Sequence, residues 1–152
     1  MAPTCKVNAN GAKTWYLNGK REYANGTKEW YLNGKYHRED GPAVDNASGY
    51  KAWFLNGKRH REDGPAIEWA NGDKEWWLNG KRHRVGGPAL EYANGTKAWY
   101  INDNRHREDG PAIEYTNGDK LWYLNGEYII NDPLVFLIKL HKYRLTSSLS
   151  SV

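Results

Sequence analysis

"EWWLNGKRHRVGGPALEYANGTK", from Glu75 to Lys97, decides the fold of this chain. It contains two Asn-Gly pairs, Asn79-Gly80 and Asn94-Gly95, each between segments in which apolar and polar residues alternate. A type I′ turn needs positive φ at both central residues, and Asn-Gly supplies this at low cost. The stretch therefore predicts two antiparallel hairpin turns joined by extended segments.

The stretch is one copy of a repeat with a fixed length. Marker tryptophans recur every 23 residues, at Trp30, Trp53, Trp76, Trp99 and Trp122. Trp15 precedes Trp30 by only 15 residues, because the first copy lacks the segment that elsewhere reads "HREDGPA" or similar. Tandem copies of one short unit indicate a stack in which each unit packs on its neighbours, with atypical terminal units.

These patterns predict an all-β fold, an elongated and twisted stack of antiparallel β-hairpin repeats, in a single sheet or solenoid-like, with a C-terminal capping α-helix. We expect an N-terminal tail over residues 1–10, the repeat domain over 11–131, the helix over 132–145 and a disordered tail over 146–152. Within each repeat, the strand that returns from the first turn should be interrupted at "EDGP", because proline cannot donate to a ladder and glycine favours bulges.

Composition narrows the class of protein. The chain has 152 residues, a formal net charge of +4 and 1 cysteine. A single cysteine rules out an intrachain disulfide framework. The N-terminal segment has no apolar run of the secretory type, and no stretch approaches the roughly 20 apolar residues of a membrane span, so we expect a cytoplasmic protein.

Alternation along the strands predicts which side chains are buried. Trp53 and Leu55 should share the core face, as should Trp76 and Leu78. In the return strand, we expect the same face to carry Ile67 with Trp69 and the equivalent pairs Leu90–Tyr92 and Ile113–Tyr115. On this assignment, truncating Trp76 should destabilise the protein more than truncating Trp77.

The opposite face then carries a second row of rings, for which an exposed binding ladder is one interpretation. Arginines follow each turn and could rim the row, and rings with arginine are typical of interface hot spots. The candidate binding residues are Tyr31, Phe54, Trp77, Tyr100 and Tyr123, with Arg59, Arg82 and Arg105. A second packing layer is the other interpretation of this row.

Chemistry-bearing residues repeat without forming a distinct site. His37, His60, His83 and His106 occur once per repeat, too far apart to share one metal ion, so we expect no metal and no cofactor. The histidines and arginines should instead brace the "EDGP" turn, with Asp40, Asp63 and Asp109 as acceptors. In the third copy Val85 and Gly86 replace the two acids. We find no catalytic motif and expect no enzyme.

The pattern breaks after Gly126. Asp132 before Pro133 is a helix start, and a dense apolar run follows it. We expect this helix to cover the exposed edge of the last hairpin. A homodimer through the helix, or a helix lying on a membrane surface, remains an alternative.

The unit resembles a MORN repeat, a 23-residue β-hairpin, through "EWWLNGKRH" and "EYANGTK" between about Gly11 and Gly126. It departs from that pattern because Lys74 and Glu75 stand where the family has glycine, and because "HREDGPA" lengthens the return strand. The resemblance is to a variant form of the kind seen in viral and bacterial repeat proteins. It implies an assembly scaffold, sometimes associated with lipid, and no catalysis. "KEWYLNG" is also similar to choline-binding repeats of secreted proteins.

The leading hypothesis is a non-enzymatic scaffold that binds another protein, such as a viral accessory factor or an inhibitor of a host protein in the host cytoplasm. One alternative is a module that binds a glycan, a choline-like group or a nucleotide through the aromatic ladder. Another is nucleic-acid binding by rings and basic side chains, which the interspersed charges disfavour. We expect no membrane partner.

Overall fold

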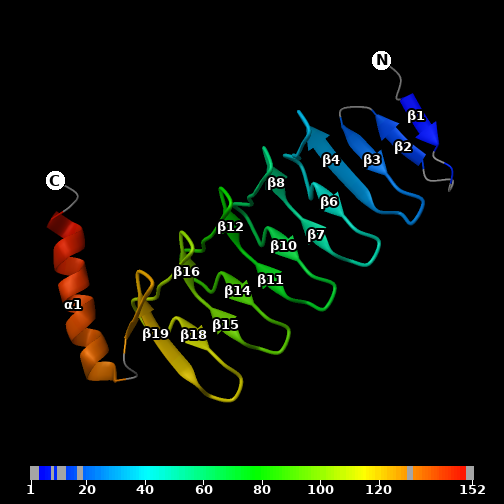
Figure 1. The fold of residues 1–152 in the computed structure, drawn as a ribbon. Helices are drawn as coiled ribbons and strands as arrows, with labels where there is room; N and C mark the ends of the chain where they lie inside the picture. The colour runs from blue at the N-terminus through cyan, green and yellow to red at the C-terminus, as the bar shows by residue number, and fades with distance from the viewer. Residues whose placement is uncertain (1–3, 8, 10–12, 17–18, 130–131, 150–152) are drawn as a thin grey trace. The chain divides into compact units, whose positions relative to one another are not determined.

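The computed structural model describes residues 4–7, 9, 13–16, 19–129 and 132–149. These residues form antiparallel β-hairpins in chain order, followed by one α-helix, as the sequence predicts (Figure 1). The chain divides into two compact units, Met1–Lys81 and Arg82–Val152, which are described in turn.

The first unit contains the shortened repeat and the first two full repeats. Its strands are β1 (Thr4–Val7), β2 (Lys13–Tyr16), β3 (Lys20–Glu22), β4 (Lys28–Leu32), β5 (Lys35–Tyr36), β6 (Val44–Asp45), β7 (Lys51–Ala52), β8 (Phe54–Leu55), β9 (Lys58–Arg59), β10 (Ile67–Glu68), β11 (Lys74–Glu75) and β12 (Trp77–Leu78). The main sheet runs β3-β4-β6-β7-β10-β11, all antiparallel. β1 pairs with β2, β4 also pairs with β5, and β8 pairs with β9.

The second unit follows the same plan and ends in the helix. Strand β13 (Lys81–Arg82) spans the point where the units meet in the sequence, followed by β14 (Leu90–Glu91), β15 (Lys97–Ala98), β16 (Tyr100–Ile101), β17 (Asn104–Arg105), β18 (Ile113–Glu114), β19 (Lys120–Leu124) and β20 (Glu127–Ile129), and then α1 (Pro133–Leu149). The sheet of this unit runs β14-β15-β18-β19-β20, and β16 pairs with β17.

The two Asn-Gly signals form different turns. The first of each full repeat is type I′: Asn56 has φ 51° and Gly57 has φ 80°, so both central residues are left-handed. At the second, only Gly95 is left-handed, with φ 92°, and its N–H donates to the carbonyl of Tyr92. That is the hydrogen bond of a type I turn followed by a glycine bulge, so the prediction of a second type I′ turn is wrong.

The return strand is interrupted at "EDGP", as predicted. In the second full repeat, β9 ends at Arg59 and β10 begins only at Ile67. Backbone hydrogen bonds tie each return segment to the next hairpin: the N–H of Arg61 donates to the carbonyl of Trp77, and that of Gly80 to the carbonyl of Arg59. The ladder between hairpins thus continues through a segment that is irregular on its own.

The assignment of the buried face is wrong in part. Ile67, Leu90 and Ile113 are buried as predicted, but their expected partners Trp69, Tyr92 and Tyr115 are 43–44% exposed. The core is instead built on alanines from the face we expected to be open; Ala43, Ala52, Ala66, Ala89 and Ala112 are completely buried. In the first unit, Ala52, Ala66, Ile67 and Trp77 form one cluster. Small alanines leave room for large rings to pack over them.

The ends of the chain are more ordered than predicted. Thr4–Val7 form β1, although residues 1–10 were expected to be a tail. The helix continues to Leu149, so the predicted tail is helical at residues 146–149, and residues 150–152 lie outside the described ranges. Asp132 caps the helix as predicted, because its Oδ1 accepts the N–H of Leu134 at 2.8 Å.

The helix packs against the last hairpin of the second unit. Phe136 and Leu140 form a buried cluster with Leu124 and Ile129. Ion pairs also link the helix to the strands and turns beside it, from Lys139 to Glu127 and from Arg144 to Glu108. With 17 residues of mixed polarity, α1 is too short and too polar to cross a bilayer, and no other helix occurs in the described part of the chain.

Candidate functional site: a cleft between two hairpins

The predicted binding ladder is not an exposed surface. Trp77 and Tyr100 retain only 8% and 7% of their accessible area, and Tyr31, Phe54 and Tyr123 are half-buried. The rings fill the layer over the buried alanines, and their burial agrees with the interpretation of this row as a second packing layer. Binding by the half-buried members stays a prediction.

The three predicted rim arginines belong to the same layer. The guanidinium of Arg59 lies 4.9 Å from the ring of Trp77, Arg82 lies 5.5 Å from Tyr100, and Arg105 lies 5.2 Å from Tyr123. Each arginine thus stands over the ring of the following hairpin. These cation–π contacts stabilise the stacking of neighbouring repeats within each unit.

A polar cluster closes the start of this layer in the first unit. The carboxylate of Glu29 accepts the hydroxyls of Tyr23, Tyr31 and Tyr36, at 2.7, 2.8 and 3.1 Å. Burial raises the pKa of Tyr31 above its ordinary value, and hydrogen bonds with Tyr36 and Glu29 add to the shift. The hydroxyl therefore stays protonated and donates, which is the role of a structural partner.

The other face carries the marker tryptophans. An arginine lies on the tryptophan ring of its own repeat and bonds to the "EDGP" turn, and this arrangement is called the brace. In the second full repeat, Cζ of Arg61 lies 4.1 Å from the ring of Trp53. Its Nε donates to Asp63 at 2.8 Å, and its Nη1 donates to the carbonyl of Pro65 and to Glu68, both at 3.2 Å. The brace recurs at Arg38 over Trp30 and at Arg107 over Trp99, each at 4.0 Å.

The glycine of "EDGP" leaves room for this brace. A Cβ added to Gly64 would lie 2.9 Å from Cζ of Arg61, and one added to Gly41 would lie 2.9 Å from Cζ of Arg38. A larger residue would displace the guanidinium from its place between the indole and the turn. The predicted bracing of the turn by arginine and aspartate is therefore confirmed, and its reason is steric as well as electrostatic.

The histidines join each brace to the neighbouring hairpin. Nδ1 of His60 accepts the backbone N–H of Asn79 at 3.2 Å, and its Nε2 lies 3.6 Å from Glu62. His37 makes the same contacts with Asn56 and Glu39. Within the described ranges, no three side chains of the His, Cys, Asp and Glu types come together in a way that could hold a metal ion.

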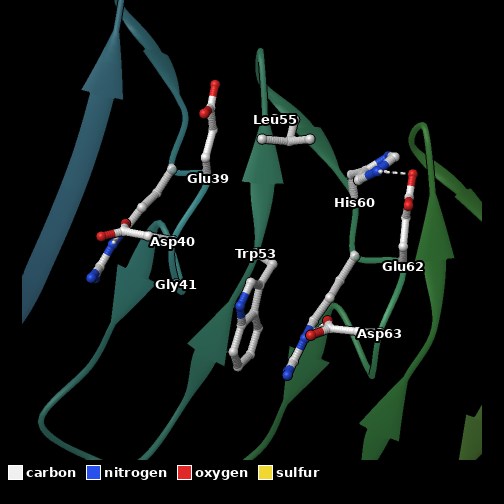
Figure 2. A pocket seen from close by; sticks show the side chains of 10 residues that line it. Glu39, Asp40, Gly41, Trp53, Leu55, His60, Glu62 and Asp63 are labelled. Atoms are coloured by element: carbon white, nitrogen blue, oxygen red, sulfur yellow. Dashed lines mark hydrogen bonds and ion pairs between the residues drawn. The ribbon is translucent and has the colours of Figure 1, made fainter.

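Each brace, with its turn, forms a ridge on this face. In the first unit, a cleft of about 700 Å³ lies between two successive ridges. Its floor carries Trp53 and Leu55 on one hairpin (Figure 2). One wall is the ridge of Arg38, Glu39, Asp40 and Gly41, and the other is the ridge of His60, Arg61, Glu62 and Asp63. Figure 2 shows Trp53 standing between the two ridges.

Charge in this cleft is distributed unequally. The guanidinium groups are held inside the braces, with side chains 23% exposed, whereas the four carboxylates are 82–84% exposed. Hydrogen bonding and the positive charge of Arg61 lower the pKa of Asp63 below its ordinary value, and Arg38 does the same for Asp40. The lining thus presents two enclosed cations and four outward anions.

The second unit contains a related cleft of about 430 Å³ with a different charge. Its floor carries Trp99 and Ile101, but one wall is formed by Arg84, Val85 and Gly86. Gly86 adopts φ 77°, and Arg84 keeps its bonds to the carbonyl of Pro88 and to Glu91 at 3.0 and 2.8 Å. Glu108 on the other wall pairs with Arg144. The substitution of two acids therefore leaves the brace in place and removes the anionic wall.

Sequence reasoning placed its candidate binding residues on the face opposite to this cleft. It missed the cleft residues Trp53, Leu55, Glu39 and Glu62, because it treated the tryptophan row as core. The signal lay in the segment "HREDGPA", which reads "HRVGGPA" in the third copy and is absent from the shortened first repeat. An inserted segment that is braced on a tryptophan forms a ridge, and two successive ridges enclose a cleft.

No model of a known protein family matches the chain, and no curated protein sequence matches it either.

Proposed function

We propose that this protein is a non-enzymatic repeat scaffold that binds another protein, and that the binding surface is the cleft between the Arg38 and Arg61 ridges. The observation that carries the proposal is a cleft whose floor has an indole and a leucine while its rim has exposed charged groups. An apolar centre with a polar rim is the usual composition of a protein-binding surface.

The chemistry of the cleft supports binding over catalysis. Each arginine is committed to a ring, a carbonyl and a carboxylate of its own repeat, and each histidine to a backbone N–H of the next hairpin. A catalytic group needs a free proton or lone pair directed at a substrate. The likeness to MORN repeats points in the same direction, toward an assembly scaffold.

The test uses a random 12-residue peptide library selected against the immobilised full chain, followed by ¹H–¹⁵N NMR with the enriched peptides. We expect these peptides to shift the amide signals around Trp53 and Leu55. Leu55→Ser should weaken binding about tenfold, since it removes an apolar contact at the centre of the site.

Leu32→Ser is the matched control. Leu32 occupies the equivalent position in the preceding hairpin and is 48% exposed, but the shortened first repeat gives it no ridge on one side. It should leave binding unchanged. The proposal is wrong if no peptide is enriched, or if the enriched peptides shift signals elsewhere and bind the Leu55 variant normally.

A further inference from the structure

We infer that the cleft of the first unit selects a basic segment of its partner and takes an arginine side chain between Glu39 and Glu62. This inference rests on the proposed function and specifies the chemistry of the partner. The argument uses the charge of the cleft, the spacing of its walls and the indole on its floor.

The charge of the cleft is opposite to that of the chain. The lining has four carboxylates against two arginines, whereas the whole chain carries a formal net charge of +4. Asp40 and Asp63 each accept an arginine Nε through Oδ1, and a carboxylate has capacity for further donors. An anionic partner would meet outward carboxylates before it reached the enclosed guanidinium groups, so the cleft complements a cation.

The spacing suits a guanidinium. Glu39 and Glu62 are equivalent residues of successive repeats, and two strands separate such residues by about 10 Å. Both side chains are flexible and more than 80% exposed, so they can close on a group between them. A guanidinium presents donors along several edges of one plane and can pair with two carboxylates together.

The floor favours the same group. One face of Trp53 is taken by the guanidinium of Arg61, at 4.1 Å from its ring, so an incoming arginine meets the rest of the indole and Leu55 as an apolar floor. Trp53 stands between the walls that carry Glu39 and Glu62 (Figure 2). The alkyl chain of an incoming arginine would lie over Leu55, while its head group reaches the carboxylates.

The second unit supplies a natural comparison. Its cleft has the same type of floor, but Val85 and Gly86 stand where Glu39 and Asp40 stand in the first cleft. That leaves two arginines against two carboxylates, and Glu108 is already paired with Arg144. The inference therefore requires that the second cleft bind a basic segment more weakly than the first.

The test titrates the full chain with unlabelled hexa-arginine, hexa-lysine and hexa-glutamate, followed by ¹H–¹⁵N NMR. We expect hexa-arginine to shift signals around Trp53 and Glu62, hexa-lysine to bind more weakly and hexa-glutamate to leave the cleft unchanged. The E39V/D40G variant, which copies the sequence of the third repeat, should weaken hexa-arginine binding about tenfold. The converse V85E/G86D variant should create a second site and raise the stoichiometry from one to two.

A matched control removes two exposed acids outside the cleft, Asp119→Asn with Glu127→Gln, and should change the affinity less than twofold. Circular dichroism confirms that each variant is folded. The inference is overturned if hexa-arginine leaves the cleft signals unmoved, or if E39V/D40G binds it as tightly as the unmodified chain. If enriched library peptides bind the cleft without basic residues, the inference fails while the proposed function stands; if no peptide binds, the proposed function itself fails.

Discussion

Arg59 and Arg61 belong to one hairpin, and each stands over a tryptophan, but they act on opposite faces. Arg59 reaches Trp77 of the following hairpin, and its Nε is buried without a hydrogen-bond partner. Arg61 lies on Trp53 of its own hairpin and makes three further hydrogen bonds there. The side chain of Arg59 therefore joins neighbouring repeats, whereas the side-chain contacts of Arg61 close within one repeat.

This difference predicts which residues of a repeat can change without a loss of packing. A contact shared by two hairpins constrains both, so the ring layer cannot lose a member without a loss of packing. A brace closed within one repeat can change its outward residues, as the third copy does when Val85 and Gly86 replace two acids. The outward residues of the brace can thus change while the brace itself is kept.

The largest expected effect comes from the ring layer. Trp77 is buried in the core, so Trp77→Ala should lower the free energy of unfolding by about 3–5 kcal/mol. Trp76 is its half-buried neighbour on the opposite face, so Trp76→Ala should lower the free energy of unfolding by less. Chemical denaturation of both variants measures the difference. This order is the reverse of the one expected from alternation alone, and equal losses would contradict the face assignment.

A smaller difference is expected between the two arginines. Arg61→Met should lower the free energy of unfolding by about 2 kcal/mol, because the carbonyl of Pro65 and two carboxylates lose a charged donor. Arg59→Met should cost about 1 kcal/mol or less, since methionine can pack on Trp77 and a desolvated charge is removed. Denaturant midpoints compare the pair. A larger loss at Arg59 would show that its cation–π contact outweighs the brace.

The smallest expected effect is a pH dependence at the brace. Arg61 lowers the pKa of Asp63 in the folded state, so the carboxylate stabilises the fold above its unfolded pKa of about 4, and this contribution disappears as pH falls through the folded pKa. Asp63→Asn should therefore lower the melting temperature slightly at pH 7, and the difference should vanish near pH 2–3. In an Arg61→Met background, the effect of Asp63→Asn on the melting temperature should not depend on pH. If the same pH dependence persisted there, Arg61 would not be its cause.

Local chemistry explains the features that the sequence determined by itself. Asn56-Gly57 and its equivalents form type I′ turns because few other dipeptides reach positive φ twice. Asp132 with Pro133 begins the helix because the carboxylate accepts an otherwise unpaired N–H and proline has none to satisfy. The return strand breaks at "EDGP" because proline and glycine do not continue a ladder. Each of these depends on a few neighbouring residues.

Only the tertiary structure decided which face is buried and where the cleft lies. Both faces carry a row of rings, so alternation separates two rows without ranking them. The ranking comes from contacts between hairpins: Ala52 and Ala66 leave space that Trp77 fills, whereas Trp53 is half-covered by Arg61 from its own repeat. Burial of these two rings is settled by residues 8 to 25 positions away in the chain. The alternation of residues along a strand shows on which face each side chain lies. It does not show how deeply that face is buried by the neighbouring hairpins.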